Sequence, residues 1–187
     1  DYVLALAQPG AEPAAALAEL TVTAPAHEYA APPVTHQARG AVFGDVVSLA
    51  GYDLPDAAQA GQEVRITLVW RVERETTEPL KTFVHLLDGN GRLIAGSDAV
   101  PGGWQRPSTG WVEGEYIRDT HTVRLPEGLA PGEYRWEAGV YNADTLERLL
   151  LPDGADADGE VEAVADDIDE IVGQVHVELD VGVPRGE

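Results

Sequence analysis

The sequence predicts an all-β fold, an immunoglobulin-like antiparallel β-sandwich. Short runs alternate between apolar and polar residues, turn-forming residues separate these runs, and the run from 82 to 87 is almost entirely apolar. Alternation places every second side chain in a core, and a continuous apolar run is typical of a central strand covered on both faces. The separating turns are Asp88-Gly89-Asn90-Gly91, Glu113-Gly114, Pro126-Glu127-Gly128 and Pro131-Gly132.

The N-terminal segment, residues 1–38, is rich in alanine and proline and contains no lysine or arginine. We predict that it is a partly ordered lead-in or linker that precedes the sandwich. One short helix is expected over 13–20, since proline is tolerated in the first turn of a helix. Pro32-Pro33 predicts extended backbone, because a residue that precedes proline avoids the helical region.

The sandwich is predicted to span residues 39–182. Its first strand is expected to place Phe43, Asp45, Val47 and Leu49 on one face before a turn at 51–55. The clearest strand covers 62–72, because regular alternation over this length is a strong β signal. Its inward-facing residues are expected to be Val64, Ile66, Leu68, Trp70 and Val72.

The remaining strands follow in order along the chain. The loop 88–91 makes a hairpin from the central strand into residues 92–95, and a long loop, 100–113, carries two tryptophans. Later strands are predicted at 115–125, 133–142, 145–151 and 171–179. The acidic loop, residues 152–170, separates the last two. Its nine carboxylates and lack of basic residues predict a mobile, solvated segment.

The charge and composition of the chain disfavour several classes of function. It has 33 acidic and 12 basic residues, for a net charge of −21 at pH 7. We expect no nucleic-acid partner, because a polyanion would be repelled. No run approaches the roughly 20 apolar residues of a membrane helix, so no direct membrane insertion by this chain is expected. The absence of cysteine excludes disulfides, thiolate zinc sites and cysteine nucleophiles.

The histidines and serines do not form a known catalytic motif. Asp119 and His121 share one face of a predicted strand, and Ser97 or Ser108 would be needed to complete an acyl-transfer triad. The spacing gives no support for such a triad, and the chain contains no Gly-x-Ser-x-Gly motif. We therefore favour structural histidines and predict that this chain is not itself an enzyme.

Calcium is the metal hypothesis that the sequence supports best. Asp153, Asp156, Asp158 and Glu160 offer hard oxygen ligands close together, and the adjacent glycines permit tight turns. The spacing does not fit an EF-hand, because the first position of that loop would fall on a glycine. We favour the simpler interpretation of a solvated acidic loop, and no other cofactor is expected.

Carbohydrate is the small ligand that the sequence supports best. The loop 100–113 contains Trp104 and Arg106 next to two glycines, with Trp111 further on. An exposed aromatic ring flanked by planar polar side chains is the usual sugar platform of a β-sandwich. The alternative for Trp104 and Trp111 is that they close the open end of the sandwich, and for Trp111 we favour this structural role. Trp70 and Trp136 fall on inward-facing positions of their strands.

An ordered string of short motifs runs through the predicted sandwich. It consists of Phe43-Gly44-Asp45, Leu49-Ala50-Gly51-Tyr52-Asp53-Leu54, Leu68-Val69-Trp70-Arg71, Phe83-Val84-His85-Leu86-Leu87-Asp88, Gly91-Arg92-Leu93, Trp111-Val112-Glu113-Gly114-Glu115, Leu125-Pro126, Pro131-Gly132-Glu133-Tyr134 and Gly139-Val140-Tyr141. This string resembles the C-terminal soluble domain of multi-spanning bacterial membrane proteins. Those proteins look like glycosyltransferases of the protein-mannosyltransferase type (family 39).

The resemblance implies a domain of the cell envelope, outside the cytoplasm, tethered through a membrane region outside this sequence. No catalytic residue is carried over, because the chemistry of such proteins would lie in their membrane portion. The expected function is a non-catalytic accessory domain whose candidate ligand is a glycan or a glycosylation acceptor. The alternative is a structural or protein-interaction module with no small ligand. An exposed Trp104 would favour the first and a buried one the second.

Overall fold

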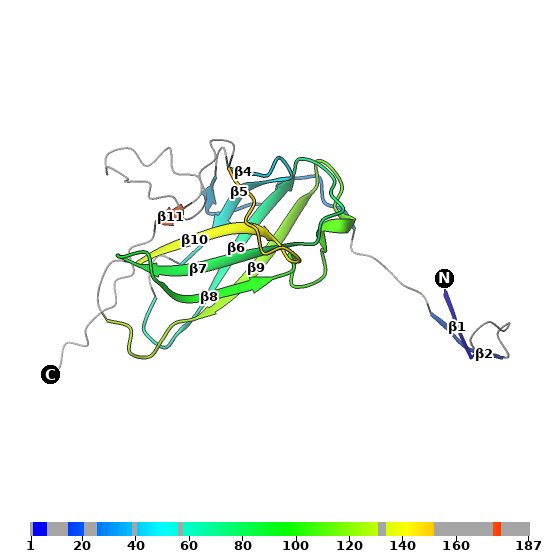
Figure 1. Ribbon diagram of the computed structural model, residues 1–187, viewed down its shortest axis with the longest axis horizontal. Helices are drawn as coiled ribbons and strands as arrows, with labels where there is room; N and C mark the ends of the chain where they lie inside the picture. Colours follow the sequence, from blue (N-terminus) through cyan, green and yellow to red (C-terminus); the bar gives the residue numbers. More distant parts are fainter. Residues whose placement is uncertain are drawn as a thin grey trace.

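The computed structural model describes residues 2–6, 15–20, 26–38, 41–55, 58–130, 134–151 and 174–176. Two antiparallel sheets pack face to face as a sandwich, which confirms the predicted all-β class (Figure 1). Within the described ranges the only helical element is the 3-10 turn Ser108–Gly110. The same ranges contain no helix with the length and apolarity that a membrane span requires.

One sheet has the strand order β3-β5-β6-β9, with β4 also pairing with β5. These strands are β3 (His36–Gln37), β4 (Val42–Phe43), β5 (Val47–Asp53), β6 (Glu63–Val72) and β9 (Tyr116–Arg124). The other sheet has the order β11-β10-β7-β8. Its strands are β7 (Leu80–Asp88), β8 (Leu93–Ala99), β10 (Tyr134–Asn142) and β11 (Gln174–His176). Figure 1 shows β10, β7 and β8 lying over β5, β6 and β9.

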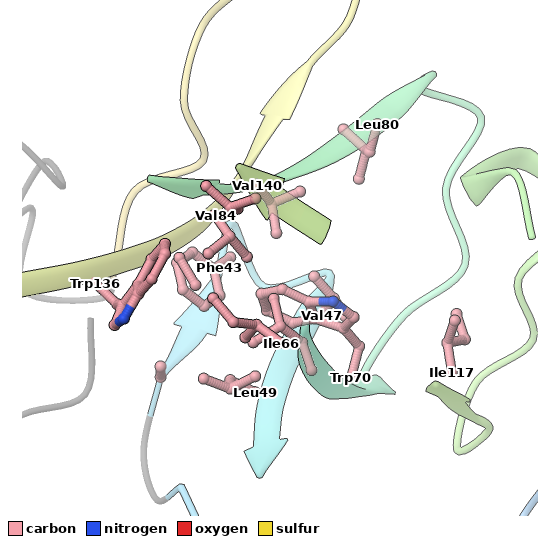
Figure 2. Close-up of a cluster of buried hydrophobic side chains, with 14 of the residues drawn as sticks. Phe43, Val47, Leu49, Ile66, Trp70, Leu80, Val84, Ile117, Trp136 and Val140 are labelled. Atoms are coloured by element: carbon pink, nitrogen blue, oxygen red, sulfur yellow. The ribbon is translucent and has the colours of Figure 1, made fainter. Parts of the chain in front are cut away.

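The core lies between the two sheets and follows the predicted alternation. All five inward-facing residues predicted for β6 are buried. Trp70 meets Phe43 edge to face with ring centroids 5.6 Å apart, and Trp136 of β10 closes the core from the opposite sheet (Figure 2). Each large apolar side chain buried in this way contributes about 1.5–3 kcal/mol to folding. This alternation therefore positions the polar groups that share the inner faces.

The central strand β7 is covered on both faces, as predicted. Leu80, Val84 and Leu86 pack in the core, whereas Phe83 lies on the outer face and is still only 1% exposed. The Arg148 guanidinium lies 4.6 Å from the centroid of the Phe83 ring, and His85 stacks against that ring at 4.5 Å. The neighbouring strand leaves room for the ring, because Gly139 pairs directly with Phe83.

The helix predicted over 13–20 is wrong. Ala15–Leu20 forms strand β2, which pairs antiparallel with β1 (Tyr2–Leu6) and places Tyr2 opposite Leu20. An isolated helix of this length is marginal in water, because nucleation costs more than its few hydrogen bonds return. Pairing with β1 gives backbone groups on both sides of a bulge at Leu17 partners instead.

The first predicted strand is broken at Asp45. The chain turns after Phe43, with the Val46 amide donating to the Phe43 carbonyl at 3.0 Å, and strand β5 begins at Val47. Phe43, Val47 and Leu49 are buried as expected, but Asp45 is exposed with φ of 58°. A carboxylate would be costly in the core, so the turn places Asp45 in solvent.

The strand predicted over 145–151 does not form. Residues 145–151 make a single bridge, Tyr141 to Arg148, in place of a strand. The turn before this bridge is closed by the Asn142 side chain, which accepts hydrogen bonds from the amides of Asp144 and Thr145. Of the last predicted strand, the described part is β11, which pairs with β10. The acidic loop lies outside the described residues.

We predict that Gly139→Ala destabilises the domain by about 1–3 kcal/mol, because adding a methyl group overpacks a filled site. A Cβ at this position would lie 2.4 Å from the Phe83 ring. Gly89→Ala is the matched control, since a Cβ there meets nothing within 4 Å. Urea denaturation measures both variants. Equal stabilities would show that the outer face of β7 repacks freely.

Candidate functional site: the Trp104 loop

The Trp104 loop, residues 100–113, presents one large aromatic side chain to solvent. Trp104 is 64% exposed and follows two glycines, and all three residues have positive φ. A left-handed conformation costs a bulky residue about 1–2 kcal/mol, so this backbone is not the local preference of tryptophan. Backbone hydrogen bonds close the turn, from Trp104 N to Val100 O at 3.0 Å and from Arg106 N to Pro101 O at 3.0 Å.

Lys81 lies beside the exposed ring. Its Nζ is 5.5 Å from the centroid of the Trp104 ring, within cation–π distance. Lys81 is the only lysine in this acidic chain, and none of the ion pairs among the described residues involves it. No local pattern in the sequence indicates this contact, since Lys81 is 23 residues from Trp104. The one feature of the sequence that could have drawn attention to Lys81 is that the chain contains no other lysine.

Arg106 faces a buried carboxylate. Its guanidinium forms an ion pair with Glu115 and donates a hydrogen bond to the carbonyl of Ala26 at 3.0 Å. His27 Nδ1 lies 2.5 Å from Glu115 Oε2, and the Val112 amide donates to Oε1 at 2.9 Å. Burial raises the pKa of Glu115, but these hydrogen bonds and the arginine lower it more. The pKa therefore lies below the ordinary value of 4.5.

Trp111 lies in the core. It is 3% exposed, and its indole nitrogen donates to the carbonyl of Arg106 at 2.9 Å. The three predicted sugar-binding residues are therefore not on one surface. Trp104 faces solvent, Arg106 pairs with a buried carboxylate, and Trp111 supports the loop from below.

The carboxylate of Asp119 anchors the start of the loop. It is fully buried, and its Oδ1 accepts the Gly102 amide at 3.0 Å. Its Oδ2 accepts hydrogen bonds from Thr82 Oγ1 at 2.6 Å and Trp70 Nε1 at 3.3 Å, and lies 3.1 Å from His121 Nε2. Burial raises the pKa of Asp119, but His121, Thr82 and Gly102 lower it more. The pKa therefore lies below 3.8, and the side chain is charged at neutral pH.

Ser108 anchors the far side of the loop. Its hydroxyl accepts a hydrogen bond from the Leu80 amide at 2.7 Å and donates to the Glu78 carbonyl at 2.6 Å. The loop is thus tied to the sandwich by buried groups before and after Trp104. Such anchoring restrains the loop, so the exposed indole is held in place by its surroundings.

The structure does bring Ser97, His121 and Asp119 into one hydrogen-bonded chain. Ser97 Oγ lies 3.1 Å from His121 Nδ1, on the side of the ring opposite Asp119. Because the carboxylate accepts, His121 Nε2 donates to it, and Nδ1 shares a hydrogen bond with the serine hydroxyl. His121 and Asp119 are buried between the sheets, and the carboxylate also binds Trp70 and Gly102. We interpret the hydrogen bonds that join Ser97, His121 and Asp119 as a structural network.

The predicted calcium ligands lie outside the described residues. Asp153, Asp156, Asp158 and Glu160 belong to the acidic loop, so calcium binding remains a prediction. Among the described residues no group of three or more histidine, aspartate or glutamate side chains could hold a metal ion.

Comparisons with known proteins concern the fold. No protein-family model matches the chain, and no curated protein matches it. Among solved structures, the chain is similar to the C-terminal domain of Wzt, with 13% sequence identity and a TM-score of 0.44. The match covers 58% of this chain and 67% of that one.

We predict that Asp119→Asn destabilises the domain by about 3–5 kcal/mol, because breaking a buried charged network leaves donors unpaired. The new amide group would face hydrogen-bond donors on both sides. Glu63→Gln is the control, since the exposed Glu63–Arg124 pair, 3.9 Å apart, is expected to contribute little. Chemical denaturation at pH 7 measures both variants. A loss below 1 kcal/mol for Asp119→Asn would contradict its role as an anchor.

Acid is expected to weaken the contact between Glu115 and the Trp104 loop. Because the pKa of Glu115 is depressed in the folded state, its stabilisation is fully present above about pH 4.5. It is lost as the pH falls through the folded pKa. Glu115→Gln is expected to be less stable at pH 7 and to show a weaker loss of stability below pH 4.5. Denaturation across this range, with Glu63→Gln as control, tests the prediction. An unchanged acid dependence in Glu115→Gln would refute it.

Proposed function

We propose that this domain is a glycan-recognition module and that Trp104 is its stacking platform. The observation that carries the proposal is a largely exposed indole on a loop anchored to buried groups. An exposed tryptophan in a left-handed conformation contributes little to folding, so this placement favours a role in binding. One face of a pyranose ring carries C–H groups that pack on an indole, while the hydroxyls at its edge remain free for hydrogen bonds.

Lys81 supports the same ligand class. Its ammonium group has three donors and lies over the Trp104 ring without a carboxylate partner among the described residues. It is therefore placed to donate to hydroxyl or carboxylate oxygens of a sugar that stacks on the indole. A large apolar partner would gain less from this position, because it would leave the ammonium group desolvated and unpaired.

The sequence resemblance supports the wider context of the proposal. In that context the chain is a non-catalytic accessory domain of a membrane glycosyltransferase-like protein. It would lie outside the cytoplasm and hold a glycan or acceptor for the membrane portion of the same polypeptide. Sequencing of the full reading frame tests this context, because many hydrophobic spans upstream are expected. A signal peptide alone would point to a free secreted protein.

We expect Trp104→Ala to weaken glycan binding by about tenfold or more, since a central aromatic anchor carries a large share of a small interface. Leu146→Ala is a matched control, because Leu146 is also exposed, at 72%, and also has positive φ. A glycan array probed in calcium and in chelator measures both variants and the parent chain. The chelator series also tests the predicted calcium site.

Each outcome of the array decides between the two functional classes. Binding lost in Trp104→Ala and kept in Leu146→Ala supports the platform. Equal binding by the parent chain and Trp104→Ala would place the glycan site elsewhere. A blank array in both buffers would contradict glycan recognition and favour the structural or protein-interaction module.

A further inference from the structure

A strap, residues 26–38, lies on the outer face of the sheet that contains β5, β6 and β9. The Tyr116 amide donates to the Glu28 carbonyl at 2.6 Å, and Arg118 Nη2 donates to the Pro33 carbonyl at 3.3 Å. Near its end the strap pairs with β5 through β3. Val69 faces outward, since it pairs with Gly51 and Arg118, and it is nevertheless only 1% exposed. The strap thus covers this part of the sheet.

The strap does not fill the space beneath it. A pocket of about 390 Å³ remains between the strap and the sheet, which we call the strap pocket. Its walls combine aliphatic side chains with polar groups from Gln37, Ser48, Arg71, Glu73 and Tyr116. This volume lies within the range of small-molecule sites. Trp104 does not line this pocket.

The polar groups of the strap pocket form a neutral unit. Glu73 accepts a hydrogen bond from Ser48 Oγ at 2.6 Å and forms an ion pair with Arg71. Glu73 raises the pKa of Arg71. Burial raises the pKa of Glu73, but the hydrogen bond from Ser48 and the charge of Arg71 together lower it by more. Both groups are therefore charged at neutral pH, and their charges cancel.

These groups favour a ligand that has no net charge and can both donate and accept hydrogen bonds. A charged ligand would lose hydration without meeting an opposite net charge. An apolar ligand would cover the ion pair and leave its remaining donors without partners. Hydroxyl groups suit both partners, because they donate to carboxylate oxygens and accept from guanidinium N–H groups.

We propose that the strap pocket is a second binding site, which takes one neutral sugar residue. This proposal does not depend on the Trp104 platform. The ring C–H groups would contact the aliphatic walls, and the hydroxyls would bind Arg71 and Glu73. Ala50, the bulged residue of β5, lines the same pocket, so a larger side chain there would occupy the ligand volume.

Amide chemical shifts in the ¹⁵N-labelled full chain test the proposal, with the methyl glycosides of mannose, glucose and galactose as probes. At least one glycoside is expected to shift amides of the strap, β5 and Tyr116 with millimolar affinity. Trp104→Ala is expected to give the same shifts. Failure of the Trp104 platform and failure of this site are therefore distinguishable. No shift in these residues with any probe, or shifts confined to the Trp104 loop, would overturn the proposal.

Two variants test the chemistry of the pocket. Ala50→Leu is expected to abolish the shifts, because the added side chain fills the cavity. Glu73→Gln is expected to weaken the neutral glycosides about tenfold and to improve binding of glucuronate, because Arg71 then lacks its counter-charge. The assignment would be overturned if the parent chain bound glucuronate more tightly than the neutral glycosides. Unchanged affinities in Glu73→Gln would also overturn it. This second variant keeps the test valid if Ala50→Leu does not fold.

Discussion

The buried carboxylate of Asp119 is the interaction on which both the sandwich and the exposed loop depend. It accepts hydrogen bonds from Trp70 in its own sheet, from Thr82 in the opposite sheet, and from the Gly102 amide. A buried charge that lost these donors would cost several kcal/mol, so the sheets and the loop are held in one arrangement. The presentation of Trp104 therefore rests on a group between the two sheets.

A second buried carboxylate, Glu115, connects the Trp104 loop to the strap. Arg106 reaches it from the loop and His27 from the start of the strap. The same strap then runs over the sheet and covers the strap pocket. The two candidate sites differ in chemistry, since one is an exposed ring next to a cation and the other is lined by an ion pair with no net charge. They share the strap as a mechanical support, so a change at Glu115 is expected to affect both.

Sequence reasoning succeeded where local pattern and burial agree. The strands β6, β7 and β9 were predicted within a few residues, because alternation or a continuous apolar run is imposed by the core itself. It failed over Ala15–Leu20, where helix formation is too weak in a short segment and pairing with β1 decides. It also failed at Asp45, where one polar residue interrupts an apolar pattern and the chain turns.

By itself, the sequence determined the fold class, the core positions of Trp70 and Trp136, and the absence of cysteine chemistry, because these follow from residue type and period. Only the tertiary structure decided the character of the candidate sites. Trp70 and Thr82, which bind Asp119, come from other strands, and the Ala26 carbonyl, which binds Arg106, comes from the strap. The strap pocket is likewise built from segments tens of residues apart. Such contacts leave no local pattern, since they are set by which strands pair and how the sheets pack.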